Sequence, residues 1–296
     1  MPELPEVETI RRDLLENILH QPIVSLNILF AKTARNPAAF FKKSLLKKEF
    51  RAIERRGKLL IFDIKGGEFL LVHLKMTGQL IYLHQAKRVA GGHSLSSIKS
   101  KPSFLSSVGG DLPNRHTRIW LEFKNGGRLF FNDLRKFGYW QIVSQDELNK
   151  IIAQNYGPEP LTADFSAVSL AAILRGRKVK IKALLLDQRK VAGLGNIYVD
   201  ESLWAAGVSP NRLAGSLKAE EIKRLWLEIN KIIARAVKYR GTTFSDYVDS
   251  RGKKGGFSKF LQVYGRSKEK CSQCGRPIKK EKIAGRGTHY CPNCQK

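Results

Sequence analysis

Apolar residues in this 296-residue chain recur with two different spacings, and the spacing changes along the sequence. Near the N-terminus the spacing is helical, with apolar positions at Val7, Ile10, Leu14 and Ile18. A helix is therefore predicted over 7–19. Pro5 fits the first turn of that helix, where a missing N–H costs nothing. The helix is expected to begin almost at the chain terminus.

Short apolar and aromatic runs follow, which predict strands at 59–64, 68–74, 79–84, 118–123, 128–132 and 139–143. KGGE and KNGG separate neighbouring runs as hairpin turns, so antiparallel pairing is expected. Many short strands at this spacing indicate a β-sandwich or barrel. Between them, residues 85–113 are rich in Lys, Ser and Gly with little periodicity. We interpret that segment as a mobile surface insertion.

After Gln145 the pattern becomes helical, with candidate helices at 146–155, 166–176, 181–188, 196–207 and 218–241. The last of these has one apolar stripe, and Gly241 is its natural end. Residues 242–260 are glycine-rich, basic and aromatic, which predicts either a functional loop or a disordered one. The fold class expected from these patterns is α+β, with two parts: an N-terminal helix and antiparallel β-sandwich, then a helical part.

The charge balance indicates an anionic partner. Lys and Arg number 53 against 26 Asp and Glu, a formal net charge of +27. Nucleic acid is the commonest partner of so basic a chain, although membrane surfaces, acidic proteins and a merely solubilising surface remain open. No apolar run approaches the roughly 18 residues that a spanning helix needs, and no secretory signal is visible. A cytoplasmic protein with no membrane association is expected.

All four cysteines lie in the last 26 residues. Their spacing, C-x2-C, a sixteen-residue gap and C-x2-C, is typical of a structural zinc site. Two disulfides are the alternative, which a reducing compartment disfavours. Four thiolates leave zinc no open position, so one structural Zn²⁺ ion is expected, with ligands Cys271, Cys274, Cys291 and Cys294.

The second residue, Pro2, is a candidate nucleophile. Removal of the initiator methionine would leave its secondary amine free, and an α-amino group has a reference pKa of about 7.7–8.0. Such an amine can attack an electrophilic sugar carbon and form an iminium. Glu3 stands beside it as a candidate general acid or base. The alternative interpretation is that Pro2, Glu3, Glu6 and Glu8 merely favour the start of a helix.

Eight motifs occur in an order that resembles bacterial formamidopyrimidine-DNA glycosylase: MPELPEVET, RRGKLLIF, HLKMTGQL, NDLRKFG, GPEPL, GLGNIYVDESLW, VYGR and the four-cysteine tail. The resemblance covers nearly the whole length. It implies a bifunctional glycosylase and abasic-site lyase of bacterial base-excision repair. Such an enzyme removes 8-oxoguanine and formamidopyrimidines from double-stranded DNA and then nicks abasic sites by β,δ-elimination. A bacterial cytoplasmic location and a monomer are expected.

The resemblance also implies domains. These are a catalytic helix and β-sandwich at 1–145, a helix-two-turn-helix module at 146–266 with a lesion-covering loop near 242–258, and a zinc finger at 267–296. It assigns catalytic roles to Pro2 as nucleophile, Glu3 as proton donor, Lys58 in elimination and Arg286 in the δ step. The DNA-contacting residues that it implies are Glu6, Met76, His116, Arg135, Lys136, Phe137, Arg177, Lys178, Lys182 and Asn196. Of these, Met76, Arg135 and Phe137 would fill the hole left by a flipped base.

The chain departs from the family pattern in three places. Lys136 stands where a second arginine is expected, which keeps the charge but loses bidentate geometry. Leu134 replaces a proline, and the 85–113 segment is long. Two other functions remain open: an endonuclease VIII-like glycosylase for oxidised pyrimidines, and a non-catalytic zinc-ribbon protein that binds damaged DNA.

Overall fold

The computed structural model describes residues 1–85, 87–95, 104–242, 247–248 and 256–296. By its internal contacts the chain forms two compact units. The first unit comprises Met1–Ile152 and Tyr239–Ser258, and the second comprises Ala153–Lys238 and Lys259–Lys296. Each unit is described by itself. Most of the 243–255 segment, which holds the expected lesion-covering loop, lies outside the described residues.

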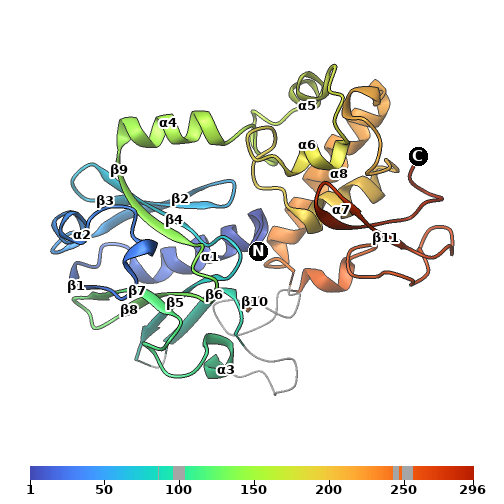
Figure 1. The fold of residues 1–296 in the computed structure, drawn as a ribbon. Coiled ribbons are helices and arrows are strands. Elements are labelled where there is room, and N and C mark those ends of the chain that lie inside the picture. Colours follow the sequence, from blue (N-terminus) through green and yellow to red (C-terminus); the bar gives the residue numbers. More distant parts are fainter. Residues whose placement is uncertain (86, 96–103, 243–246, 249–255) are drawn as a thin grey trace. The chain divides into compact units, whose positions relative to one another are not determined.

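The first unit contains an N-terminal helix, two sheets and short helical segments (Figure 1). Its helices are α1 (Leu4–Ile18), η1 (Ala31–Thr33), α2 (Ala38–Leu45), α3 (Phe104–Val108) and most of α4 (Gln145–Asn155). Its strands are β1 (Ile23–Ile28), β2 (Phe50–Arg56), β3 (Leu59–Ile64), β4 (Glu68–His73), β5 (Gly78–His84), β6 (Lys87–His93), β7 (Thr117–Phe123), β8 (Arg128–Asp133), β9 (Tyr139–Ser144) and β10 (Tyr247–Val248).

Every pairing between these strands is antiparallel. One sheet has the order β1-β7-β8-β5-β6-β10 and the other has the order β2-β3-β4-β9. The KGGE and KNGG turns join β3 to β4 and β7 to β8, as the sequence predicts. The expected antiparallel β-sandwich is confirmed.

Helix α1 starts at Leu4, three residues earlier than predicted, and contacts strands of both sheets. Its apolar residues Val7, Ile10, Leu14 and Ile18 join the core that the two sheets share. One close approach requires glycine: a Cβ at Gly91 of β6 would lie 2.4 Å from Ile10 Cγ1. The amphipathic pattern therefore fixes which face of α1 enters the core, and β6 makes room for it.

The interpretation of residues 85–113 as an irregular insertion is wrong in part. Lys87–His93 forms strand β6, which pairs with β5, and Phe104–Val108 forms helix α3. Val89 and Ala90 are buried, and Val108 packs in a small cluster with Ile81 and Phe130. Strand β6 was not recognisable from the sequence because one of its positions, Gly91, is a glycine that leaves room for Ile10 of α1. Strands β1 and β2 and helix α2 were also absent from the prediction.

The second unit is mainly helical and ends in a hairpin (Figure 1). Its elements are α5 (Ala167–Leu174), α6 (Ile181–Leu186), α7 (Asn196–Ala205), η2 (Ala214–Ser216), α8 (Ala219–Lys238), η3 (Phe257–Phe260, which begins at the end of the first unit), β11 (Lys279–Ile283) and β12 (Arg286–Tyr290). Helix α8 buries Leu225, Ile229 and Ile233 from the predicted stripe. Helix α7 contacts α6, α8 and β12, so it lies at the centre of the unit.

The C-terminal hairpin has a small core of its own. Trp204 from α7 packs with Val263, Ile278 and the buried Cys271 and Cys291. Among the described residues no helix combines the length and apolarity that crossing a bilayer requires.

Candidate functional site

The N-terminus of α1 holds the two residues predicted to carry the chemistry. Pro2 is buried, and Glu3 is the residue that caps the helix. Glu3 and Glu6 form a capping box, in which the Glu3 N–H donates to Glu6 Oε2 at 2.9 Å. Starting the helix therefore accounts for Glu3 as well as Pro5, whereas Pro2 lies before the helix and has no part in the capping box.

Glu6 connects the start of α1 to the segment that follows α8. Its Oε1 accepts hydrogen bonds from the Thr242 N–H at 2.8 Å and the Thr242 hydroxyl at 3.2 Å. Gly241 precedes this contact with φ +82°, and a Cβ there would lie 2.5 Å from Glu6 Oε1. Glu6 is only 3% exposed. It is thus built into the protein beside Pro2 and Glu3, and its predicted DNA contact stays a prediction.

Lys58 lies in the tight turn between β2 and β3. Arg56 and Leu59 are paired across the hairpin, which leaves Gly57 and Lys58 as the two turn residues. Gly57 has φ +59°, as the first position of a type II′ turn requires. Lys58 itself is 4% exposed, so it is not the solvated strand end that a lone lysine before an apolar run would suggest.

His73 is a candidate site residue that the sequence reasoning missed. It is the last residue of β4 and lies opposite Leu59. Burial, together with the positive charges of Lys75, Lys58 and Arg35, lowers the pKa of His73 to about 3. Its Nδ1 accepts the Lys75 N–H at 3.0 Å, so the neutral ring carries its proton on Nε2. The HLKMTG motif was the available signal.

The cations around His73 also stack on a tyrosine. The Arg35 guanidinium carbon lies 3.3 Å from the Tyr139 ring centroid, and Lys75 Nζ lies 5.8 Å from it. Burial raises the pKa of Tyr139, so this ring is a neutral cation–π partner. The result is a positive cluster around a neutral histidine, an arrangement suited to an anion such as phosphate.

Two turns carry the residues predicted to fill the space of a flipped base, and the second of them is exposed. Met76 lies in the turn between β4 and β5, and residues 134–137 form the turn between β8 and β9. Phe137 is 54% exposed and the Arg135 guanidinium stacks on its ring at 4.8 Å. Lys136 adopts φ +61° and its Nζ lies 4.8 Å from the Phe30 ring centroid. Both aromatic and cationic groups therefore protrude from the protein.

Buried Asp133 ties these two turns together. It accepts hydrogen bonds from the Thr77 hydroxyl, from the Arg135 N–H at 3.2 Å and from the Gly138 N–H at 2.7 Å. The Arg135 N–H also donates to Thr77 Oγ1 at 2.9 Å. Thr77 follows Met76 directly, so these hydrogen bonds connect the backbone next to Met76 to the 134–137 turn. The structure thus connects the two turns that carry Met76, Arg135 and Phe137, the residues predicted to fill the space of a flipped base.

His116 points inward. It is 9% exposed, and its Nε2 accepts a hydrogen bond from Arg115 Nε at 3.1 Å. Burial lowers its pKa, as do the charges of Arg115 and Arg118. The predicted DNA contact of His116 is not tested by this geometry, and the exposed cation at this position is Arg115.

In the second unit, the predicted phosphate ligands fall into two places. Arg177 and Lys178 are exposed in the connection between α5 and α6. Asn196 is the first residue of α7, and its Nδ2 donates to the Gly287 carbonyl at 2.9 Å. Arg286, exposed at the start of β12, precedes Gly287. Asn196 and Arg286 are therefore neighbours.

Lys182 is fully buried. Its Nζ binds Asp200 Oδ1 at 2.6 Å, and both side chains are 0% exposed. Asp200 Oδ2 also accepts the His289 N–H at 2.8 Å, which ties α7 to the hairpin. Lys182 thus has a structural partner, and its predicted association with the damaged base stays a prediction.

The four cysteines form one cluster, and their Sγ atoms all lie within 4.8 Å of one another. Cys271 and Cys294 are 3.9 Å apart and Cys274 and Cys291 are 3.5 Å apart, too far for disulfides, which have S–S bonds of about 2.05 Å. A tetrahedral ion with Zn–S bonds of about 2.3 Å would place sulfurs about 3.8 Å apart. The cluster therefore fits a metal ion bound by four thiolates.

Three family profiles match the chain. "Formamidopyrimidine-DNA glycosylase N-terminal domain" matches residues 1–140, "Formamidopyrimidine-DNA glycosylase H2TH domain" matches residues 156–248, and "Zinc finger found in FPG and IleRS" matches residues 268–296.

Similar proteins match over their full length. A formamidopyrimidine-DNA glycosylase of Geobacillus kaustophilus is 41% identical and one of Pelotomaculum thermopropionicum is 39% identical; each match covers 100% of this chain and at least 99% of the relative. A solved Lactococcus lactis Fpg in complex with abasic-site DNA is 37% identical with a TM-score of 0.83, covering 99% of both chains. Another complex holds MutM on DNA containing carbocyclic 8-oxo-G, with 37% identity, a TM-score of 0.84 and full coverage of both chains.

Proposed function

Because the chain belongs to the formamidopyrimidine-DNA glycosylase family, we propose that it is a bifunctional DNA glycosylase and abasic-site lyase acting on oxidised purines. The observation that carries this proposal is Pro2, placed directly before the capping residue of α1 in a chain that matches the family from end to end. The net charge of +27 supports a nucleic-acid substrate.

Pro2 acts as the nucleophile once Met1 has been removed. Its amine attacks C1′ of the damaged nucleotide, the bond from C1′ to the base breaks, and the base leaves with that electron pair and takes up a proton. Glu3, which stands next to Pro2, donates a proton that helps the sugar ring to open. As the C1′–O4′ bond breaks and the Pro2 nitrogen gives up its proton, the product is an iminium that joins that nitrogen to C1′.

The iminium then permits elimination. Loss of the C2′ proton gives an enamine, whose electrons expel the phosphate from C3′; loss of the C4′ proton then expels the phosphate from C5′. Lys58, buried in the turn next to the His73 cluster, assists this elimination and binds the DNA backbone. The neutral ring of His73 keeps one N–H donor for a phosphate oxygen.

The base reaches Pro2 by leaving the duplex, which costs a few kcal/mol of unstacking. Met76, Arg135 and Phe137 fill the space that it leaves. The hydrogen bonds of Asp133 and Thr77, which connect the two turns, support this role, because side chains on a backbone that is already ordered lose little conformational entropy on insertion. Phosphates are bound by Arg177, Lys178, Asn196 and Arg286, and Arg286 takes part in the δ step.

Zinc is the metal that the cysteine cluster binds. The sulfur spacing fits tetrahedral thiolate coordination, and all four positions are taken by protein ligands. The ion would hold the hairpin that carries Arg286 and supply no chemistry of its own. Chelation or Cys291→Ser should therefore unfold the hairpin and abolish DNA binding, whereas unchanged binding by metal-free protein would contradict a structural role.

Borohydride trapping tests the proposal. Protein with a free Pro2 should form a covalent adduct with DNA that contains 8-oxoguanine opposite cytosine, and mass spectrometry should place the adduct on the N-terminal peptide. The matched control retains Met1 and should give none. Absence of an adduct with free Pro2 would favour a damage-binding protein without catalysis.

Substrate preference separates the two glycosylase alternatives. Single-turnover excision of 8-oxoguanine should be faster than excision of thymine glycol from otherwise identical duplexes. A strong preference for thymine glycol would instead support an endonuclease VIII-like activity.

A further inference from the structure

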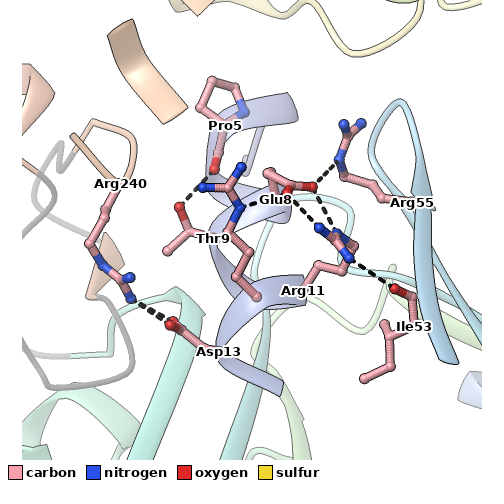
Figure 2. Close-up of polar contacts among 9 residues, drawn as sticks. Pro5, Glu8, Thr9, Arg11, Asp13, Ile53, Arg55 and Arg240 are labelled. Carbon is pink, nitrogen blue, oxygen red and sulfur yellow. Dashed lines mark hydrogen bonds and ion pairs between the residues drawn. The ribbon is translucent and has the colours of Figure 1, made fainter. Parts of the chain in front are cut away.

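Glu8 lies on α1, one turn after the helix begins, and is at the centre of a cluster of three arginines, of which Arg55 belongs to β2 (Figure 2). Its carboxylate accepts hydrogen bonds from Arg11, Arg12 and Arg55 at 2.8–3.2 Å. Although burial raises it, the hydrogen bonds and charges of the arginines lower the pKa of Glu8 to about 2. Starting a helix does not need three arginines, so the cluster calls for another explanation.

Arg55 connects this cluster to the turn that contains Lys58. Its Nε donates to Glu8 Oε2 at 3.2 Å, and its NH1 donates to the Gly57 carbonyl at 2.9 Å. That carbonyl belongs to the peptide group that joins Gly57 to Lys58. One guanidinium therefore fixes both the carboxylate on α1 and the peptide plane from which the Lys58 side chain departs.

Arg11 strengthens the same attachment. It donates to both oxygens of Glu8 and, through NH1, to the Ile53 carbonyl of β2 at 3.2 Å. Helix α1 is thus fastened to the β2–β3 hairpin at two points, through Arg11 at the Ile53 carbonyl and through Glu8 at the Arg55 guanidinium (Figure 2). The ion pair of Arg55 with Glu8 is well shielded, with side chains 11% and 10% exposed. Arg12 differs, since its side chain is 55% exposed.

We propose that Glu8 and Arg55 are positioning residues, which hold Lys58 in a fixed place relative to the Pro2 end of α1. This inference rests on the proposed function, in which Pro2 forms the iminium and Lys58 assists elimination. Two groups that act in succession on one sugar must keep a fixed separation, and they belong to different elements of the chain. The Glu8 and Arg55 bridge connects those elements directly.

The test measures two steps separately on DNA that contains a preformed abasic site. Borohydride trapping reports iminium formation at Pro2, and strand cleavage under single-turnover conditions reports elimination. Arg55→Ala should slow cleavage roughly tenfold to a hundredfold, because a displacement of about 1 Å can cost about a hundredfold in rate, and it should change trapping less than about threefold. Arg12→Ala removes an arginine from the same carboxylate without touching Gly57, and it should leave both rates unchanged.

Two further variants separate positioning from folding and from charge. Arg55→Lys keeps the charge but lacks the fork that binds Glu8 and Gly57 together, so it should be as slow as Arg55→Ala. In a double-mutant cycle, Arg55→Ala should add nothing to the loss already caused by Lys58→Ala. Glu8→Gln should also slow cleavage in protein shown by its thermal melt to be folded.

Normal cleavage by Arg55→Ala or Arg55→Lys, or losses that add in the Lys58 cycle, would overturn the inference. Failure of the proposed function has a different signature, in which the wild-type protein with free Pro2 gives no adduct at all. If Lys58→Ala cleaves normally, both the role of Lys58 and the positioning inference are wrong. The role of Pro2 is tested separately, by the borohydride-trapped adduct.

Discussion

Helices α1 and α7 each use buried carboxylates to hold distant segments, but they do so in different ways. On α7, Asp200 binds Lys182 in a fully enclosed pair, and Glu201 accepts the N–H groups of residues 262–264 at 2.8–2.9 Å. On α1, Glu8 binds three arginines, one of which is more than half exposed. An enclosed pair has no solvent to replace a lost cation, and Asp200 without Lys182 retains its contact with the His289 N–H, whereas Glu8 keeps two arginines when one is removed.

The difference separates an element that holds a unit together from one that aligns a site. Helix α7 connects α6, the 262–264 segment and the hairpin, so its carboxylates support folding of the second unit. Helix α1 is already anchored by its apolar face, so its arginine cluster is free to set the position of a turn.

Lys182→Met should give the largest effect. It removes the cation from the enclosed pair and leaves the Asp200 carboxylate buried without a counter-ion, which costs about 3–5 kcal/mol. Urea unfolding measures the change. The control Lys231→Met breaks an ion pair with Glu228 whose lysine is 74% exposed, and it should stay within about 0.5 kcal/mol. Similar values for both variants would remove the distinction between enclosed and exposed pairs.

Glu8→Gln should have an intermediate effect that depends on pH. The pKa of Glu8 is about 2 in the folded protein and near its ordinary value of 4.5 when unfolded. The carboxylate therefore stabilises the folded state above pH 4.5, and this contribution is lost as pH falls toward 2. At pH 7 the loss should be about 1–3 kcal/mol.

Urea unfolding of wild type and Glu8→Gln between pH 2.5 and 7 measures this dependence. The two curves should converge as the pH is lowered. Glu16→Gln, an exposed glutamate on the same helix, should remain parallel to wild type throughout. A gap between wild type and Glu8→Gln that stays constant to low pH would mean that the arginines do not stabilise the charged form.

Arg12→Ala should have the smallest effect. Its ion pair with Glu8 is a surface contact one turn along the helix, of a kind that contributes about 0.2–1 kcal/mol. Added salt should reduce even that difference in urea unfolding. A loss of stability as large as that of Glu8→Gln would show that Arg12, and not Arg11 or Arg55, contributes most of the stabilisation by this cluster.

The sequence predicted those features whose physical cause is local. The stripe of α8, the two hairpin turns and the cysteine spacing depend on residues near one another in the chain, and the structure bears them out. Strand β6 was missed because its Gly91 leaves room for Ile10, a residue about eighty positions away in the chain.

In the candidate site too, local motifs could be read from the sequence, whereas contacts between distant residues could not. Motif resemblance singled out Lys58, but it could not show that Glu8 reaches the preceding peptide through Arg55, 47 residues from Glu8. Nor could it show that Lys182 pairs with Asp200, or that His73 lies among cations. Such contacts depend on tertiary packing, which no local pattern encodes.

The hydrogen bonds that connect the Met76 turn to the 134–137 turn bear on how quickly a protein with the proposed function could survey DNA. Asp133 and Thr77 fix the backbone beneath Met76 and Phe137 before any duplex is present. A probe that had to be ordered anew at each base pair would lose conformational entropy at every step. In the proposed function, side chains carried on a backbone that is ordered in advance would enter and leave the base stack at little entropic cost, so the time spent on each undamaged pair would be short.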